Sequence, residues 1–281
     1  MVIPPESQLS PRAYAFLADL VHARSRILLG PDRQSLVAGR LAGRLRELGL
    51  DDYDAYCRLL ESPCGADEVE RLIELVATNH THFFREQAHF EILARDVLPR
   101  LVDDRSPAGR RLVVWSAAAS SGEEPYTLAI VLAEFARRRP HLSWEVQASD
   151  ISRRMLERCR AGIYEAEKVA LPDEGLLHRH FLRGIGAREG FYRVRPELRR
   201  HVVVRQVNLF QPVYPLATGL DVIFCRNVMI YFDAASRQEL VERLVAMLRP
   251  GGYLFVGHAE SLLGLRHALQ TEWPSVYRRA A

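Results

Sequence analysis

The chain has 281 residues, of which 48% are hydrophobic and 26% charged, with 15 prolines and 17 glycines. This composition excludes disordered, collagen-like and coiled-coil proteins, and the length suggests one large or two modest folded domains. The formal charge is only +3, but 37 of the 38 basic residues are arginines, because Lys168 is the only lysine. Genomic base composition can produce such a bias, so local arginine clusters are more informative than the total.

The cysteine spacing and the lack of long apolar stretches indicate the cellular compartment of the protein. Cys57, Cys64, Cys159 and Cys225 form no C-x-x-C pair, so we expect neither a disulfide framework nor a thiolate zinc site. The amino-terminal MVIPPESQLSPR lacks the apolar region of a signal peptide, and no later stretch approaches the roughly 20 apolar residues of a membrane span. We therefore predict a cytoplasmic protein with reduced thiols and no membrane insertion.

Residues 11 to 75 show helical periodicity throughout. In PRAYAFLADLVHAR, apolar residues recur at positions 16, 17, 20 and 21 behind a Ser10-Pro11 start. Further helical patterns cover about 33–48, 51–60 and 66–78, with no strand pattern among them. We predict a small all-helical domain over residues 1–75.

After about residue 110, short runs rich in Val, Ile and Phe alternate with helical patterns. The predicted strands are RRLVVWS, WEVQASD, HVVVRQVNL, LDVIFCRN and GGYLFVGH, and the predicted helices between them are TLAIVLAEFARRR, SRRMLERCRAG and SRQELVERLVAML. This alternation predicts an α/β fold in which helices cover both faces of a parallel sheet.

One interval breaks the alternation. In FLRGIGAREGFYRVRPEL, two short alternating runs flank a glycine-rich turn, which is a hairpin pattern. We predict a β-hairpin subdomain at about 163–201, inserted into an α/β domain over 95–281. Residues 76–94 form the predicted linker to the helical domain.

The turn after the first predicted strand is the first candidate site. Residues 116–122 are all small, so a ligand could approach the backbone and the start of the next helix. The G-x-G-x-x-G fingerprint is absent, and Glu123 and Glu124 would repel a pyrophosphate. The segment therefore disfavours NAD, FAD and nucleoside triphosphates. A tightly packed turn with no ligand is the alternative.

Asp150 ends the second predicted strand, where folds of this type bind the ribose hydroxyls of an adenosine-containing ligand. Aspartate is also a favoured N-cap residue, so a cap of the next helix is the alternative for this residue alone. Taken with the turn that disfavours phosphate, Asp150 favours S-adenosylmethionine, which has an adenosine and a sulfonium but no phosphate.

Two further segments carry polar groups in apolar surroundings. LDVIFCRNVMIYFD runs directly from a strand into Arg226, Asn227, Tyr231 and Asp233. VATNHTHFFREQAHF places three polar residues among phenylalanines and Val76, so we expect some of them to line a site: Asn79, Thr81 and Arg85. No carboxylate stands at a recognisable ligand spacing from His80, His82 and His89, so we predict packed or solvated histidines and no metal.

Several long motifs resemble those of the bacterial chemotaxis receptor methyltransferases, the CheR family. They are TNHTHFFRE, VWSAAASSGEEPYTLAI, ASDISRRMLERCRAGIY, IFCRNVMIYFD and LRPGGYLFVGHAE, and the resemblance covers about residues 10 to 277. It implies an S-adenosylmethionine-dependent methyltransferase sheet, Rossmann-like, whose last strand is antiparallel. It also implies transfer of a methyl group to glutamate side chains of chemoreceptor cytoplasmic helices, which makes the chain a protein-glutamate O-methyltransferase.

The resemblance also assigns residues. It places Arg85 near the methionine carboxylate and Tyr231 near the transferred methyl group, where we expect both to orient the reactants without acting as general acid or base. Asp150 holds the ribose. The cofactor positions implied are Asn79, Thr81, Arg85, Glu123, Glu124, Asp150, Asn208, Leu209, Arg226 and Asn227.

Two surfaces are candidates for receptor docking. Residues 22–50 contain six arginines against two acidic residues, a local net charge of +4, and Arg33, Arg40 and Arg44 share one helix face. With Arg46 they form the predicted docking set, for which a solvated surface is the alternative. The resemblance implies that acidic receptor helices face this domain. In some family members the hairpin binds a peptide at the receptor carboxyl terminus by strand addition, and GIGAREG resembles that version.

Two other functions compete with this interpretation. A nucleic-acid methyltransferase would suit an arginine-rich chain, but FCRNVMIY stands where the base-modifying N-P-P-Y or D-P-P-Y motif is expected. A non-catalytic scaffold that senses S-adenosylmethionine is disfavoured because Arg85, Asp150, Asn227 and Tyr231 are all present. We therefore predict no nucleic-acid partner.

Overall fold

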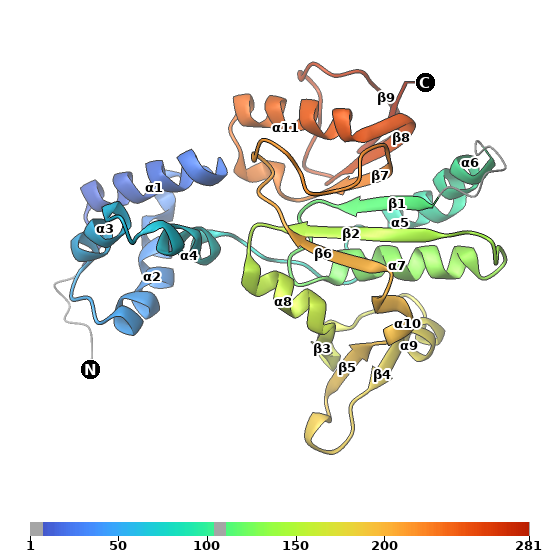
Figure 1. Cartoon of the computed structure of the whole chain (residues 1–281), viewed down its shortest axis with the longest axis horizontal. Coiled ribbons are helices and arrows are strands. Elements are labelled where there is room, and N and C mark those ends of the chain that lie inside the picture. The colour runs from blue at the N-terminus through green and yellow to red at the C-terminus, as the bar shows by residue number, and fades with distance from the viewer. Residues whose placement is uncertain (1–7, 104–110, 281) are drawn as a thin grey trace. The chain divides into compact units, whose positions relative to one another are not determined.

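The computed structural model describes residues 8–103 and 111–280 (Figure 1). Two compact units divide the chain. One contains the described residues up to Thr78 together with Tyr231–Ser236, and the other contains Asn79–Ile230 and the residues from Arg237 onward. We refer to them as the helical unit and the α/β unit.

The helical unit is built from α1 (Pro11–Ser25), α2 (Gln34–Leu48), α3 (Tyr53–Glu61) and α4 (Ala66–Val76), with a short 3-10 turn at Pro31–Arg33. Local sequence sets the ends of these helices. Ser10 caps α1 by accepting a hydrogen bond from the Ala13 amide, and Asp52 caps α3 in the same way. Gly49, with φ 67°, ends α2 in the left-handed region. The core contains Leu17, Val21, Leu41, Tyr56 and Leu72, all fully buried.

A seven-stranded sheet forms the centre of the α/β unit, in the order β6-β2-β1-β7-β8-β10-β9. Its strands are β1 (Leu112–Ser116), β2 (Trp144–Asp150), β6 (Val202–Gln206), β7 (Leu220–Cys225), β8 (Leu248–Val256), β9 (Leu269–Trp273) and β10 (Val276–Arg279). The first five strands in that order pair in parallel, and β10 and β9 add antiparallel strands at one edge.

Helices pack on this sheet through apolar side chains. They are α5 (Ala88–Ile92), which continues through a π-helical stretch (Leu93–Val97) into α6 (Leu98–Asp103), then α7 (Glu123–Ala136), α8 (Arg153–Ala161) and α11 (Ala234–Met247). In Figure 1, α7 runs beside β1 and β2, whereas α11 lies beside β7 and β8. The rings of Phe90, Phe224 and Phe255 stack in series, with centroid separations of 5.5 and 4.4 Å, and join α5 to the sheet.

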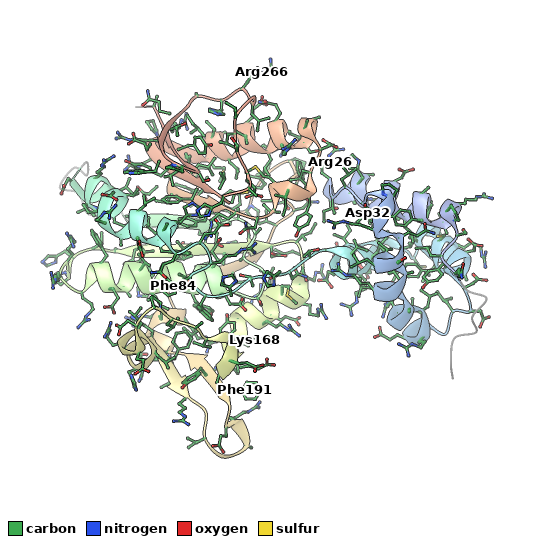
Figure 2. All side chains as sticks on the ribbon, turned by 180° about the vertical axis from the view of Figure 1, so that it is seen from behind. Arg26, Asp32, Phe84, Lys168, Phe191 and Arg266 are labelled. Carbon is green, nitrogen blue, oxygen red and sulfur yellow. The ribbon has the colours of Figure 1, made fainter. Side chains whose placement is uncertain are left out.

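A small antiparallel sheet, in the order β3-β5-β4, is inserted between β2 and β6. It comprises β3 (Ile163–Glu165), β4 (Phe181–Arg183) and β5 (Phe191–Val194), with α9 (Glu174–His180), α10 (Pro196–Arg199) and 3-10 turns at Ala166–Lys168 and Gly186–Arg188. Tyr164 and Phe181 make edge contacts with Phe83, which anchor this subdomain to the α/β unit. Phe191 lies on its exposed part (Figure 2).

The predicted fold class is confirmed, including all five strands, the helical amino-terminal part and the inserted hairpin. The hairpin is the β4-β5 pair, and β3 adds a third strand to it. Two details differ from expectation. The predicted strand GGYLFVGH begins earlier, at Leu248, and has a register shift beside Leu220. An edge strand that was not predicted, β9, adds to the sheet. None of the described helices is long and apolar enough to span a membrane.

Candidate active site

The strand order brings the predicted site segments to one edge of the sheet. β1 lies between β2 and β7, and all three strands run parallel. Their carboxyl ends therefore lie side by side, and the chain leaves them as the turn after Ser116, as Asp150 and as Arg226. The strands that follow β1 in the chain lie on opposite sides of it, β2 on one side and β7 on the other. Open α/β sheets bind their ligands where the strand order reverses in this way.

The turn after β1 is held close to its neighbours. The amides of Ala117 and Ala119 donate to the carbonyls of Phe224 and Ser149, both at 2.8 Å. At Gly122, where φ is 105°, a Cβ atom would lie 2.7 Å from the Tyr164 hydroxyl and 2.8 Å from Cys159 Sγ. The close approach explains why this segment contains only small residues.

Asp150 is nearly buried, and both its carboxylate oxygens accept backbone hydrogen bonds. The Ser120 amide donates to Oδ2 at 2.8 Å, and the Ser152 amide donates to Oδ1 at 2.9 Å. The N-cap of α8 is Ser152, whose hydroxyl accepts from the Met155 amide, so the cap alternative for Asp150 is wrong. A carboxylate oxygen can accept more than one hydrogen bond. These contacts therefore fix the position of Asp150 and leave its oxygens able to bind hydroxyl groups.

Glu123 and Glu124 have different surroundings. Glu123 is buried and accepts a hydrogen bond from the Ser121 hydroxyl at 2.7 Å, and burial raises the pKa of Glu123. Burial also raises the pKa of Glu124, although its carboxylate accepts from Ser116 at 2.7 Å and pairs with Arg226 at 3.2 Å. Arg226 therefore offsets part of the negative charge that we expected to repel phosphate at this turn.

Arg226 is the centre of a buried charge network, with a side chain only 1% exposed. Its Nη1 donates to Glu124, and its Nη2 donates to the Arg85 carbonyl and, at 3.0 Å, to Oε2 of Glu86. Asn227 Nδ2 donates to Oε1 of the same Glu86 carboxylate at 3.0 Å. Burial raises the pKa of Glu86, but the Asn227 hydrogen bond and the Arg226 charge outweigh it and hold the pKa below its usual value.

A second carboxylate, Glu260, fixes the backbone of the β7 exit. Its Oε2 accepts from the amides of Asn227 at 2.6 Å and Gly257 at 2.8 Å, and its Oε1 accepts from the Ile230 amide at 3.3 Å. Asn227 has a φ of 57°, a left-handed conformation that this clamp stabilises. A Cβ atom at position 257 would lie 2.7 Å from both the side-chain nitrogen of Asn227, Nδ2, and the Glu260 carboxylate.

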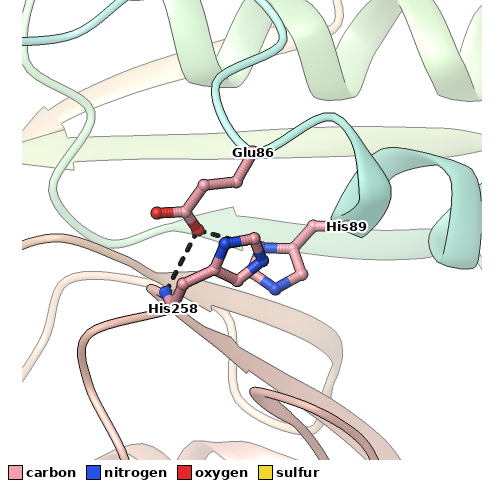
Figure 3. Close-up of side chains that lie close together, drawn as sticks. All are labelled: Glu86, His89 and His258. Atoms are coloured by element: carbon pink, nitrogen blue, oxygen red, sulfur yellow. Dashed lines mark hydrogen bonds and ion pairs between the residues drawn. The ribbon is translucent and has the colours of Figure 1, made fainter.

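Glu86 also contacts two histidines (Figure 3). Its Oε2 lies 3.3 Å from His89 Nδ1 and accepts from the His258 backbone amide at 3.3 Å. Burial, with the nearby Arg226 charge, lowers the pKa of His89 to about 4, so its ring is neutral at pH 7. One ligand atom from each of these residues lies within 4.8 Å of the others, as in a metal site. However, Arg226 donates to the same carboxylate oxygen, and its positive charge would repel a cation there.

The linker residues reach the turn after β1. The Ser120 hydroxyl donates to the Asn79 carbonyl at 3.2 Å, and the Phe84 amide donates to Thr127 on α7 at 3.2 Å. Arg85 is half-buried and donates to the carbonyl of His80 at 2.7 Å. Thr81 is half-buried on the same segment. The structure thus brings Asn79 to the turn that follows β1.

Asn208 and Leu209 follow β6, the strand beyond β2. The Val207 amide donates to the Asp150 carbonyl at 3.0 Å, which holds this segment beside the acidic residue. Asn208 Oδ1 accepts from the Phe210 amide at 2.9 Å, and Leu209 is buried. The structure therefore holds this segment beside Asp150, and the role of Asn208 and Leu209 in binding adenosine stays a prediction.

Tyr231 belongs to the helical unit. Its carbonyl accepts from the Leu28 amide at 2.8 Å, and its ring centroid lies 5.6 Å from the Arg33 guanidinium carbon. The structure does not group Tyr231 with the other predicted site residues, although it follows Asn227 by only four positions. Its role at the methyl group stays a prediction.

Two of the predicted docking arginines make structural bonds inside the helical unit. Arg40 Nη1 donates to the carbonyls of Leu75, Val76 and Ala77. It thereby supplies a donor to carbonyl groups at the carboxyl end of α4, which have no partner within the helix. Arg44 forms a bidentate pair with the nearly buried Glu68, at 2.6 and 3.0 Å. Arg46 is exposed and donates to the Ala42 carbonyl of its own helix.

The sheet, the close-packed turn after β1 and the carboxylate of Asp150 fit the class of S-adenosylmethionine-dependent methyltransferases. Family models agree with this class: residues 79–276 match the S-adenosylmethionine-binding domain of CheR methyltransferases, and residues 12–77 match the all-alpha domain of the same family. The chain belongs to the CheR methyltransferase family, and it is a methyltransferase of chemotaxis.

Similar proteins include chemotaxis protein methyltransferases of three bacteria. The chain is 40% identical to that of Salmonella typhimurium over 96% of this chain and 90% of that protein. It is 40% identical to the Escherichia coli protein over 96% and 91%. Chemotaxis protein methyltransferase 2 of Pseudomonas aeruginosa is 41% identical, over 90% of this chain and 88% of that protein.

Sequence reasoning assigned no role to Glu86, Glu260 or His258. Glu86 and Glu260 stand at the ends of the quoted motifs TNHTHFFRE and LRPGGYLFVGHAE. An acidic residue next to a predicted ligand-binding arginine was the available signal for Glu86. Nothing in the spacing connects Glu260 with Asn227, because the two are joined only across neighbouring strands.

Proposed function

We propose that this protein transfers the methyl group of S-adenosylmethionine to glutamate side chains of chemoreceptor cytoplasmic helices. The products are a glutamate methyl ester and S-adenosylhomocysteine. Family membership supports the methyltransferase activity. The observation that carries the substrate class is the similarity to chemotaxis protein methyltransferases, at 40% identity over 96% of this chain.

A carboxylate substrate needs no general base for this reaction. Glutamate has a pKa of about 4.3, so at neutral pH it is already a nucleophile and no residue has to remove a proton. S-adenosylmethionine is consumed in each turnover and supplies a methyl group on a positively charged sulfur. A substrate oxygen forms a bond to the methyl carbon as the carbon–sulfur bond breaks, and that electron pair stays on the sulfur. Opposite charges are neutralised, so a dry, aligned site favours the reaction.

The residues divide into binding and orienting groups. We propose that Asp150 binds the ribose hydroxyls, with Asn208 and Leu209 beside the adenine. Arg85 binds the methionine carboxylate, and Tyr231 orients the reacting groups. The remaining cofactor contacts in this proposal are Asn79, Thr81, Glu123, Glu124, Arg226 and Asn227.

The receptor contacts are also proposals. Arg46 is exposed on α2, and we propose that it meets acidic receptor helices. Arg33 contributes to the same surface. Arg40 and Arg44 are held by α4 and Glu68, so they support this surface from within the unit. For the β3-β5-β4 subdomain, we propose that a receptor tail peptide adds as a strand to an exposed edge.

Methyl-labelled S-adenosylmethionine and a chemoreceptor cytoplasmic fragment test the proposal. We expect label on the receptor that alkali releases as volatile methanol, which identifies a carboxyl methyl ester. Replacing the receptor's modified glutamates with alanine should remove this label. Alkali-stable label, or label in added nucleic acid in place of receptor, would contradict the proposal.

A further inference from the structure

A second arginine cluster lies in the α/β unit, away from the predicted docking set. Residues 193–205 contain five arginines against one acidic residue, Glu197, a local net charge of +4. Arg199 and Arg200 close α10 just before β6 begins. Together with Arg160 at the end of α8, they border a hollow of about 410 Å³. The rest of its lining is Tyr126, Val202 and Val204.

Two of these guanidinium groups are held in place by backbone carbonyls. Arg199 Nη2 donates to the Arg160 carbonyl at 2.6 Å, and Arg160 Nη2 donates to the Val204 carbonyl at 3.2 Å. The Arg199 stem packs on Gly162, where a Cβ atom would lie 3.4 Å from its Cδ. Because these contacts fix the side chains in advance, a ligand would lose little conformational entropy in engaging their other N–H groups.

The charges of these arginines have no carboxylate partner among the described residues. Arg160, Arg199 and Arg200 form no ion pair within residues 8–103 and 111–280, and Arg200 Nε contacts only the His201 ring, at 3.4 Å. By contrast, Arg44, Arg226 and Arg249 each bind a carboxylate. Three unneutralised guanidinium groups around one hollow raise the local concentration of anions. Guanidinium forks match the oxygens of phosphate groups.

The hollow is distinct from the cofactor site. Val202 pairs with Val146 and Gln206 pairs with Asp150, so the start of β6 lies at the end of the sheet opposite Asp150. Along the strand, Val202 lies roughly 13 Å and Val204 roughly 7 Å from the Gln206–Asp150 pair, at the rise of a β-strand. The size of the hollow suits a small molecule better than a folded partner.

From these contacts we propose that the hollow formed by α8, α10 and β6 binds a polyphosphate anion, either free pyrophosphate or the polyphosphate chain of a nucleotide. Binding there does not require the methyl-transfer site, so the inference does not depend on the identity of the methyl acceptor. The turn after β1 carries Glu123 and Glu124, which disfavour phosphate, whereas the charged residues that line this second site are all arginines.

Calorimetric titration of the full chain, saturated with S-adenosylhomocysteine, tests the site directly. We expect pyrophosphate and ATP to bind and adenosine not to bind, with affinities that fall as NaCl is raised. The double variant Arg160→Gln, Arg200→Gln should weaken pyrophosphate binding at least about tenfold. Arg205→Gln is the matched control, because Arg205 belongs to the same cluster but does not line the hollow, and it should change affinity less than about twofold.

Thermal unfolding of each variant separates lost binding from lost folding. The double variant keeps Arg199 and its bond to the Arg160 carbonyl, so we expect its melting temperature to match that of the control. Binding of ATP without pyrophosphate would place recognition on the base and overturn the proposal. Displacement of pyrophosphate by S-adenosylhomocysteine, equal pyrophosphate binding by the double variant, or binding of an acidic peptide in place of pyrophosphate would also overturn it.

Discussion

Replacing Glu86 with Gln should disturb both stability and methyl transfer, because one carboxylate holds two site residues. Oε2 of Glu86 pairs with Arg226 at 3.0 Å, and Oε1 accepts from Asn227 at 3.0 Å. Removing one partner of a buried ion pair costs about 3 to 5 kcal/mol when the other charge is left alone. Arg226 keeps Glu124 as a partner, so we expect Glu86→Gln to lower the free energy of unfolding by about 2 kcal/mol.

Methyl transfer should fall further than stability alone explains. Glutamine keeps one acceptor oxygen and replaces the other with an NH2 donor, so either Arg226 or Asn227 loses its acceptor at this position. A misplaced binding group costs about ten- to a hundredfold in kcat/KM. The measurements are urea unfolding and initial rates with labelled S-adenosylmethionine. Glu91→Gln is the control, because Glu91 is exposed and accepts a hydrogen bond from Gln87 on the same helical segment, away from Arg226 and Asn227.

The stability difference should also depend on pH. The folded structure holds the pKa of Glu86 below its usual value, so its contribution is complete above the unfolded pKa of about 4.3 and is lost as pH falls through the folded pKa. The gap between wild type and Glu86→Gln should therefore be constant near neutrality and narrow in acid. Equal unfolding free energies and equal kcat/KM for Glu86→Gln and Glu91→Gln would refute this reasoning.

Three further predictions concern other groups. Asp150→Asn should weaken S-adenosylhomocysteine binding about ten- to a hundredfold by calorimetry, because a charge-assisted hydrogen bond to ribose is lost, and unchanged affinity would remove Asp150 from the site. Arg44→Met should lower the free energy of unfolding in urea by about 2 kcal/mol, because it leaves the Glu68 carboxylate unpaired. Arg46→Glu should leave the free energy of unfolding unchanged and slow receptor methylation severalfold. The reverse pattern would contradict these assignments. A chelator should leave methyl transfer unchanged, since Arg226 occupies the Glu86 oxygen that a metal would need, and recovery of a lost rate on adding zinc would show otherwise.

The sequence predicted the helices and strands better than the side-chain contacts of the candidate site. Strands β1, β2, β6, β7 and β8 were visible as apolar runs because they are central or parallel strands, whereas β9 lies at the antiparallel edge and is largely exposed. Asp150 was predictable because a strand end fixes its position. Glu86 and Glu260 were not, because their partners are distant in the sequence and meet them only after the sheet forms.

Arginine content illustrates why charge counts along the chain do not identify a binding surface. Residues 22–50 and 193–205 each carry a net charge of +4. In the first segment, Arg40 is bound by three carbonyls and Arg44 by Glu68, so part of the excess stabilises the helical unit. In the second, Arg199 is fixed by the Arg160 carbonyl, and Arg160 beside it by the Val204 carbonyl; a carbonyl positions a guanidinium without neutralising it. A fixed arginine without a carboxylate is prepared for an external anion, and this difference distinguishes the two clusters.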